Sequence, residues 1–314
     1  MTFQYVDRIV DYESGKFIRG IKNVTRTEPF FYLLPDGRRI LSHAVVSESL
    51  AQLGSWLNML TSDFKQRPVL LGDDKTDYPD CTQAGDQIDL AVEVIRIDDD
   101  IWLTKGTATV GPRQIVVCHE CRSMMMPMEE FSGADEMRRR FKNLYRPELK
   151  DFKGLNGDFM RIPMARGARR YEPIRFIDGI VSHTPFKRVE AYKNISIVEP
   201  FFQDHFPRRP IVPGVMLLSM AGEASQFLLR RDPLKAPLNL GLLPIGMGNI
   251  RCRKFVEPGD QCVVKIDVKK GDPSVVDGVV AVGLVISCNG VRAMQGDMIF
   301  RVVSESSPTT AELS

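Results

Sequence analysis

Two stretches of this sequence align without a gap: FQYVDRIVDYESGKFIRGIKNVTRTEPFF, Phe3 to Phe31, and IRFIDGIVSHTPFKRVEAYKNISIVEPFF, Ile174 to Phe202. Ten of the 29 aligned positions are identical at a constant offset of 171 residues, and both stretches end in Glu-Pro-Phe-Phe. Further along, Gly85-Asp86-Gln87 recurs as Gly259-Asp260-Gln261. Self-similarity at this distance predicts two copies of one domain.

Each copy is predicted to hold one helix followed by long antiparallel strands. In the second copy, apolar and charged residues alternate over 264–268, as half-buried strands do, and Asn289-Gly290 is a strong hairpin signal. One helix with a meander of strands, twice over, is an α+β pattern. In the first copy, one buried helical face is predicted from five apolar residues at helical spacing: Val46, Leu50, Leu53, Leu57 and Leu60.

Length and composition limit the possible functions. A chain of 314 residues has room for two domains, and a net charge of +2 gives no reason to expect sequence-wide attraction to nucleic acid or membrane. The absence of a signal peptide and of any long apolar run predicts a cytoplasmic protein without a membrane span. Cys118 and Cys121 have a spacing seen in metal sites, but strand alternation explains them more simply, so no metal is expected.

The most informative segment is EPFFQDHFPRRPIVPGVMLLSMAGEASQ, Glu199 to Gln226. Its His205-Phe206-Pro207 and Pro213-Gly214-Val215 resemble the central signature of the hot-dog-fold 3-hydroxyacyl-[acyl-carrier-protein] dehydratases (FabA/FabZ-like), and Pro258-Gly259-Asp260 matches a later landmark of that family. The resemblance covers both copies and is specific in the second. It implies a double hot-dog fold, in which an antiparallel sheet wraps each long helix and the two copies pair as a pseudo-dimer.

These observations predict the domain organisation. We expect an N-terminal hot-dog domain at residues 1–126, a crossover linker at 127–172, a C-terminal hot-dog domain at 173–303 and a disordered tail at 304–314. The linker is too long for a tight connection and is predicted to contain a helix around Ala134 to Tyr145.

The predicted site is divided between the copies. In the family that the sequence resembles, the histidine works with an acidic residue 14 positions later on the helix, which acts across the dimer. In this sequence that position is Ser219, whereas the equivalent position of the first copy is Glu48. The first copy in turn has Leu34 where the second has His205. We therefore expect one site made by His205 and Glu48 and a dead site marked by Leu34 and Ser219.

Dehydration of a 3-hydroxyacyl thioester needs a base, a proton donor and a group that stabilises an enolate. His205 is suited to be the base, and Glu48 to be the donor to the departing hydroxyl, although a solvated Glu48 is the alternative. The N–H of Gly214, which opens the helix, is implied by the resemblance to hold the thioester oxygen. Gln52 is expected to assist Glu48 or to make a plain polar contact, and Glu223 is the fallback acid.

The predicted activity is dehydration of (3R)-3-hydroxyacyl-[acyl-carrier-protein] to the trans-2-enoyl form, with the substrate on phosphopantetheine and no other cofactor. A basic rim of Arg208, Arg209, Arg169 and Arg170 is suited to an acyl carrier protein, although solvated surface is the alternative. The resemblance also allows a homo-oligomer. The remaining alternatives are another hot-dog thioester enzyme (thioesterase, hydratase or isomerase) and a non-catalytic subunit that binds the carrier protein.

Overall fold

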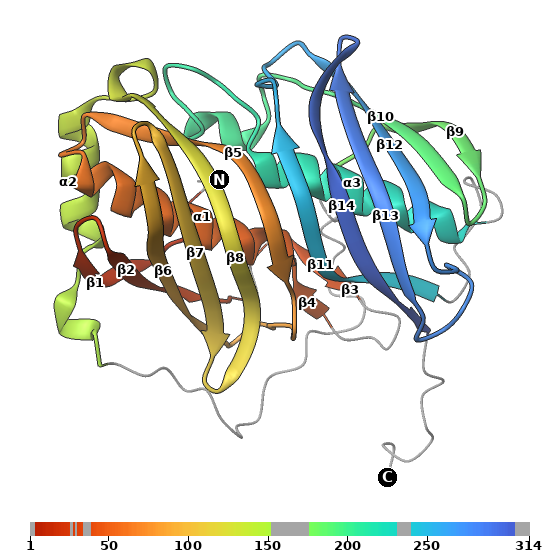
Figure 1. Ribbon diagram of the computed structural model, residues 1–314, viewed down its shortest axis with the longest axis horizontal. Helices are drawn as coiled ribbons and strands as arrows, with labels where there is room; N and C mark the ends of the chain where they lie inside the picture. Colours follow the sequence, from red (N-terminus) through yellow and green to blue (C-terminus); the bar gives the residue numbers. More distant parts are fainter. Residues whose placement is uncertain are drawn as a thin grey trace.

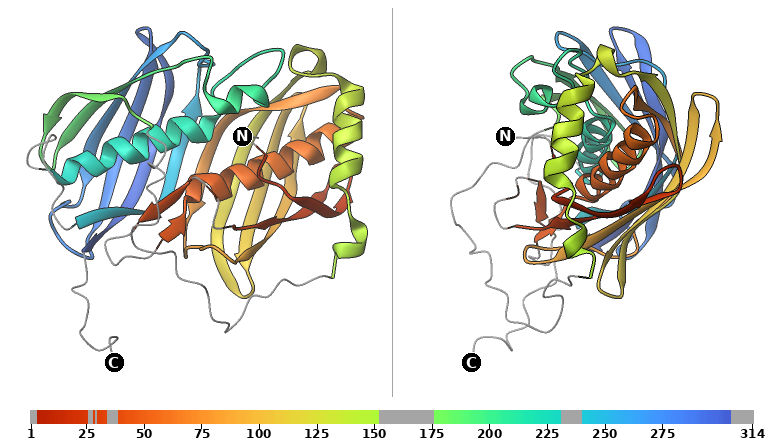
Figure 2. Two further views of the ribbon diagram at one scale, coloured as in Figure 1. Left: turned by 180° about the vertical axis from the view of Figure 1, so that it is seen from behind. Right: turned by 90° about the vertical axis from the view of Figure 1, so that its left-hand side faces the viewer.

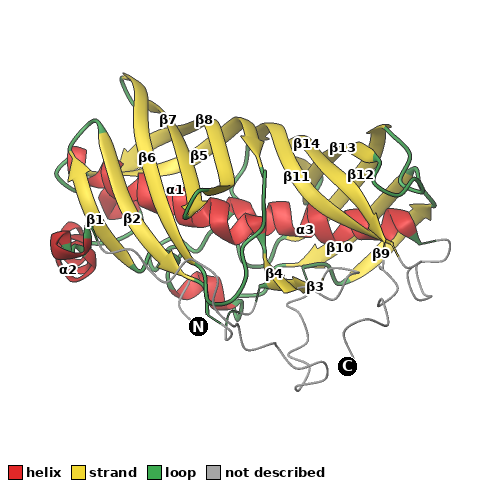
Figure 3. Ribbon diagram, turned by 90° about the horizontal axis from the view of Figure 1, so that it is seen from below, coloured by secondary structure: helices red, strands yellow, loops and turns green. Residues whose placement is uncertain are grey.

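The computed structural model describes residues 4–25, 28, 30–33, 39–151, 176–230 and 240–304. These residues include a 12-stranded antiparallel sheet that curves around two helices, α1 (His43–Thr61) and α3 (Gly214–Gln226) (Figure 1). Figure 2 shows that both helices lie along the same concave face of the sheet, and Figure 3 shows the sheet arching over them. The described helices include none that is long and apolar enough to cross a membrane.

The strand order of one half mirrors that of the other. The halves meet where β5 pairs with β11, for example with Met247 opposite Thr76. Beside the large sheet lies a small one of β3 (Phe31–Leu33) and β4 (Arg39–Leu41). In spatial order the large sheet contains β1 (Arg8–Glu13), β2 (Phe17–Asn23), β6 (Gln87–Asp98), β7 (Ile101–Val110), β8 (Arg113–Pro127), β5 (Gln66–Asp77), β11 (Leu240–Cys252), β14 (Val291–Ser304), β13 (Val279–Cys288), β12 (Gln261–Lys270), β10 (Arg188–Asn194) and β9 (Gly179–Thr184).

Residues that are identical in the two copies make the same contacts in both halves. Asp7 Oδ2 accepts a hydrogen bond from the backbone N–H of Asn23 at 2.6 Å, and Asp178 Oδ2 accepts one from Asn194 at 2.7 Å. The repeated sequence therefore reports a repeated structure. The same holds for two ion pairs, Lys22 with Glu28 and Lys193 with Glu199.

The strands predicted from alternating residues and from turn residues are present in the structure. Val264 and Ile266 of β12 are fully buried, whereas Lys265 between them is exposed. Asn289 and Gly290 both have positive φ, at 52° and 80°, as a tight turn between β13 and β14 requires. The predicted α+β class and double hot-dog fold are confirmed.

The two helices differ in length. Helix α1 has 19 residues, whereas α3 ends after 13 and continues as a single 3-10 turn, η4 (Phe227–Leu229). Of the predicted apolar stripe of α1, Val46, Leu50, Leu53 and Leu57 are buried and Leu60 is partly buried. Val45, Glu48 and Ser49 on other faces are buried as well, because α1 is covered on more than one side. The alternative of a solvated Glu48 is therefore wrong.

The linker closes one end of the molecule. After the 3-10 turn η1 (Met128–Glu130), helix α2 (Ala134–Leu144) crosses beside α1, where the ring of Phe141 lies 6.1 Å from that of Trp56 (Figure 2). A second 3-10 turn, η2 (Pro147–Leu149), follows. The predicted linker helix is thus present. Residues 152–172 of the linker and 305–314 of the tail lie outside the described residues, and the domain boundaries stay predictions.

Candidate active site

The segment from Phe201 to Ile211 holds His205 by backbone contacts. The 3-10 turn η3 (Pro200–Gln203) precedes it, and the N–H of His205 donates to the carbonyl of Phe201 at 2.9 Å. The N–H of Ile211 donates back to the carbonyl of His205 at 3.0 Å. Phe206 then packs in a small apolar cluster with Val69 and Phe131, which come from the N-terminal half and the linker. This segment, the His205 loop (residues 201–211), is therefore packed against the other half of the molecule.

His205 is neutral and has a defined tautomer. Its Nδ1 lies 2.8 Å from the carbonyl oxygen of Ile211, and because a carbonyl only accepts, Nδ1 carries the proton. Nε2 therefore carries the lone pair. Burial, with a smaller contribution from the positive charge of Arg67, lowers the pKa of His205 to about 4. At neutral pH the imidazole can accept a proton at Nε2.

Glu48 is buried on α1, with a residue exposure of 7%. Burial raises its pKa to about 7, against the opposing effects of a hydrogen bond from Gln52 and of the positive charge of Arg67. The bond runs from Gln52 Nε2 to Glu48 Oε1 at 2.9 Å. Near neutral pH a large fraction of Glu48 is therefore a carboxylic acid, which can donate a proton.

One cavity of about 460 Å³ is lined by residues from both halves. His205 and Gly214 reach it from the C-terminal half, while Glu48 and Gln52 reach it from α1. The structure thus brings together the two residues that the sequence places in separate copies. Apolar side chains form much of the remaining wall, including Val6, Trp56, Met59, Val69, Leu70, Met124, Met137, Leu144, Phe206, Ile211, Val215 and Leu217.

Gly214 opens α3 at the wall of this cavity. The first N–H groups of a helix have no acceptor within it and carry partial positive charge. Pro213, which precedes Gly214, makes no side-chain cap. A β-carbon at position 214 would lie 3.1 Å from Leu70 Cδ2, so glycine keeps room beside the helix terminus. The arrangement can hold an oxygen that gains negative charge.

The two predicted supporting residues behave differently. Gln52 joins Glu48 to the rest of the fold, because its Oε1 accepts the backbone N–H of Tyr5 at 2.9 Å while its Nε2 donates to Glu48. Glu223, at the equivalent position of α3, accepts the N–H of Phe176 at 2.5 Å and is not among the residues that line the cavity. In the structure the fallback acid is engaged with the backbone of Phe176.

The predicted basic rim is largely occupied by contacts within the protein. Arg209 forms an ion pair with Glu130 at 2.7 Å and lies over the ring of Phe255, and Arg208 Nη1 donates to the carbonyl of Glu129 at 3.2 Å. Both arginines thus hold the linker turn η1 beside the His205 loop. Arg169 and Arg170 lie outside the described residues.

In the N-terminal half, the place equivalent to the start of α3 is occupied by side chains. His43 opens α1 where Gly214 opens α3, stacks on Tyr78 at 4.7 Å and places Nε2 3.0 Å from the carbonyl of Asp80. Burial lowers the pKa of His43, so the ring is neutral. Ser219 is buried and donates to the carbonyl of Val215 on its own helix at 2.8 Å. Leu34 lies outside the described residues.

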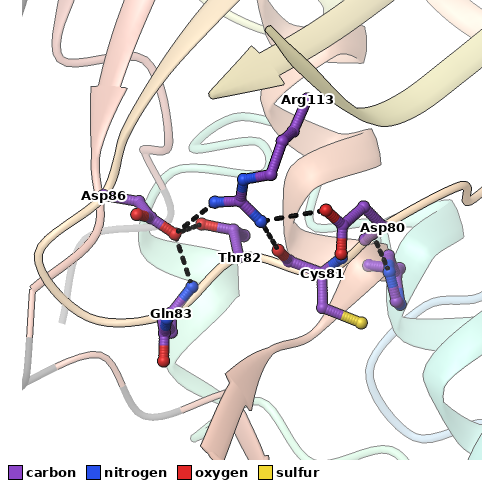
Figure 4. A network of polar contacts seen from close by, with 7 residues as sticks. Asp80, Cys81, Thr82, Gln83, Asp86 and Arg113 are labelled. Atoms are coloured by element: carbon purple, nitrogen blue, oxygen red, sulfur yellow. Dashed lines mark hydrogen bonds and ion pairs between the residues drawn. The ribbon is translucent and has the colours of Figure 1, made fainter. Parts of the chain in front are cut away.

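A polar network lies next to His43 at the start of α1. Figure 4 shows Arg113 reaching the carboxylates of Asp80 and Asp86 and the carbonyl of Cys81. Asp86 also accepts the hydroxyl of Thr82 at 3.0 Å, and its side chain is fully buried. A network of this kind ties the described residues of this edge together.

Sequence reasoning missed two arginines in the cavity wall. Arg67, from β5, and Arg140, from α2, both line the cavity. Their positions depend on how β5 meets the His205 loop and on where the linker helix docks, and no local pattern signals either. The described residues include no group of three or more His, Cys, Asp or Glu side chains placed to hold a metal ion.

Comparisons with known proteins match part of this chain. Residues 169–296 match the family model for the FabA-like domain. Over 99 residues the chain is 37% identical to the 3-hydroxyacyl-[acyl-carrier-protein] dehydratase FabZ of Burkholderia cenocepacia strain HI2424, and 34% identical to that of Burkholderia mallei strain SAVP1. Each match covers 31% of this chain and 64% of the relative.

Solved structures extend the likeness to both halves. A putative oleoyl thioesterase from Lactobacillus plantarum has a TM-score of 0.55 at 10% identity and covers 92% of this chain and 97% of its own. A MaoC-like dehydratase has a TM-score of 0.53 at 12% identity, with coverage of 92% and 98%. At these identities the likeness shows the fold alone. The region that matches the FabA-like family model is thus one half of a double hot-dog chain.

Proposed function

We propose that the protein dehydrates (3R)-3-hydroxyacyl-[acyl-carrier-protein] to trans-2-enoyl-[acyl-carrier-protein]. The observation that carries the proposal is that His205 and Glu48, from opposite halves, line the same cavity as the α3 terminus at Gly214. The FabZ relatives support the reaction class by their names, although the matched region covers only part of their length.

The proposed reaction starts at C2 of the bound substrate. His205 Nε2 takes the proton from C2, and the N–H of Gly214 stabilises the negative charge that develops on the thioester oxygen. The C3–O bond then breaks, and Glu48 gives its proton to the departing hydroxide, which leaves as water. The imidazolium and the Glu48 carboxylate that result are restored when the proton passes back from one to the other.

The carrier protein as partner, and a role in fatty-acid or polyketide-type synthesis, belong to the same proposal. An acyl thioester on phosphopantetheine would reach the cavity from the protein surface, where Arg253 and Lys254 are part of the lining. Arg208, although it contacts Glu129, is largely exposed, so it is available to a negatively charged carrier protein. A cytoplasmic location and a homo-oligomer remain predictions.

The test follows enoyl formation from a 3-hydroxyacyl-carrier protein. We expect turnover by the wild type and a loss of about 10²- to 10⁴-fold in kcat for His205→Ala and for Glu48→Gln, the usual size for a general acid or base. Glu223→Gln is the matched control and should keep kcat within about twofold, since surface-type changes have small effects.

Three results would contradict the proposal. Activity that survives Glu48→Gln but not Glu223→Gln would overturn the site shared between the halves. Release of free thiol without enoyl formation would indicate a thioesterase. A folded wild type that turns over no chain length would favour a non-catalytic subunit that binds the carrier protein.

A further inference from the structure

Arg67 is a partly buried cation in the wall of the proposed active site. It lies near the start of β5, and its guanidinium carbon is 4.1 Å from the centre of the Phe206 ring, next to His205 in the chain. Its hydrogen bonds are weak, from Nη1 to Ser132 Oγ at 3.4 Å and to Met137 Sδ at 3.8 Å. Neither partner carries charge, so the guanidinium is held in place without being neutralised.

The neighbouring arginine of the cavity shows the contrast. Arg140 is paired with Glu136 at 2.8 Å and with Asp204 at 3.6 Å, so its charge is balanced. For Arg67, no carboxylate of the described chain lies within 4 Å of the guanidinium. Burial and the charge of Arg140 lower the pKa of Arg67 to about 10, which still leaves it protonated at neutral pH. A buried charge without a counter-charge is costly, and proteins normally pair it.

Glu48, which lines the same cavity, forms no ion pair with Arg67. Glu48 interacts with Arg67 electrostatically, but burial keeps much of Glu48 protonated near neutral pH. The rest of the wall near Arg67 is apolar, including Val69 and Met137. The cavity therefore combines room for a hydrocarbon chain with a guanidinium that has no carboxylate of the described residues within ion-pair distance, although Glu136 also acts on it electrostatically from farther away.

The position of Arg67 indicates which part of a substrate would meet it. Arg67 lies over the ring beside His205, where C2 and C3 of the substrate must react. The phosphate of a phosphopantetheine arm is separated from the thioester by the whole length of that arm. An anion close to the reacting carbons therefore belongs to the acyl chain.

We propose that Arg67 binds an anionic group on the acyl chain, so that the preferred substrates are 3-hydroxyacyl thioesters that carry a carboxylate beyond C3. This inference rests on the proposed dehydration. It predicts selection by charge at a site whose remaining wall would accept an ordinary fatty chain. Arg67 is thus a specificity-determining residue, and the proton transfers stay with His205 and Glu48.

The experiment compares matched pairs of thioesters of equal chain length, one ending in a methyl group and one in a carboxylate. For the wild type we expect kcat/KM to be at least about 10-fold higher for the carboxylate, the usual size of a hydrogen bond to a charged group. Arg67→Gln should lose that preference, because kcat/KM should fall more on the carboxylate chain than on the methyl chain. Arg67→Lys should keep part of it, and Arg96→Gln, at an exposed arginine of β6, should change nothing.

Two forms of each thioester distinguish binding of the acyl chain from binding of the phosphate. Each pair is prepared on pantetheine and on phosphopantetheine, and an Arg67-dependent preference for phosphopantetheine would assign Arg67 to the phosphate and overturn the acyl assignment. Equal kcat/KM for both chains, or an equal loss on both in Arg67→Gln, would mean that Arg67 only supports Phe206. Turnover of the methyl chain tests the dehydratase function by itself. If nothing is turned over, calorimetric binding of the same pairs still decides whether Arg67 selects the carboxylate.

Discussion

The first turns of α1 and α3 occupy equivalent places in the two halves and do opposite things. Helix α3 begins with Gly214, whose missing side chain leaves the terminus open to the cavity. Helix α1 begins with His43, whose ring fills the corresponding place and is held by Tyr78 and Asp80. The same backbone position is therefore open to the cavity in one half and filled by a packed side chain in the other. Four tests, from the largest expected effect to the smallest, address this comparison.

The largest effect should come from closing the open terminus. In Gly214→Val the β-carbon would lie 3.1 Å from Leu70 Cδ2, and the two methyl groups would occupy the cavity. We expect kcat/KM to fall by about 10²-fold or more, as happens when a donor to an oxyanion is removed. His43→Ala is the counterpart and should keep kcat/KM within about threefold, since that place is not used. Steady-state kinetics measure both values. Equal losses of kcat/KM in the two variants would contradict the different roles given to the two helix starts.

The second test compares Glu48 with Ser219. Below pH 4.5 the Glu48 side chain is protonated in the folded and unfolded chain; as pH rises toward 7 the unfolded chain loses its proton first. The wild type should therefore lose up to about 3 kcal/mol of unfolding free energy between these pH values. Glu48→Gln should not show this loss, so it becomes more stable relative to wild type as pH rises. Ser219→Ala removes no titrating group and should follow the wild type.

Urea unfolding at pH 4, 6 and 8 measures this difference. A wild type and a Glu48→Gln variant whose stabilities stay parallel across the range would show that Glu48 is solvated, against its burial.

The third test removes the network that fills the N-terminal place. Arg113→Leu removes a cation that pairs with the buried carboxylate of Asp86, which should cost about 1–3 kcal/mol of unfolding free energy. Turnover should stay within about twofold, because Arg113 is not part of the cavity lining. Arg96→Leu, which breaks an exposed pair with Asp98, should cost less than about 1 kcal/mol. A large loss of activity in Arg113→Leu without unfolding would mean that this half is used in the reaction.

The smallest effect is a shift in pH dependence. Activity should need neutral His205 and protonated Glu48, so kcat/KM should fall below about pH 4 and above about pH 7. Gln52→Glu keeps an acceptor for the N–H of Tyr5 but replaces the donor to Glu48 by a negative charge. This raises the pKa of Glu48 and moves the alkaline limb up by about one pH unit. Glu223→Gln, the mirror change, should leave the profile unmoved.

Much of the fold could be predicted because the repeated residues have structural roles. Asp7 and Asp178 each accept a backbone N–H from an asparagine of the repeat, so the alignment found residues that make the same contact between paired strands twice. The alternation of β12 and the turn at Asn289-Gly290 depend on local chemistry alone. Such signals are visible without knowing how the halves meet.

The site was only partly predictable. The pairing of His205 with Glu48 follows from the offset between the copies, and the structure places both at one cavity. The burial of Glu48 does not follow from helical periodicity, since it depends on what covers the second face of α1. Arg67 and Arg140 had no sequence signal for the same reason. Their roles are set by tertiary docking of β5 and of the linker helix.

The pairing of β5 with β11 joins two halves of a single chain. Two separate subunits that share an active site lose it when diluted below their dissociation constant, because assembly follows mass action. In a fused chain the local concentration of one half near the other is set by the connection and not by the amount of protein. Turnover per chain should therefore be insensitive to dilution, and either half is free to lose a catalytic group that its neighbour always supplies.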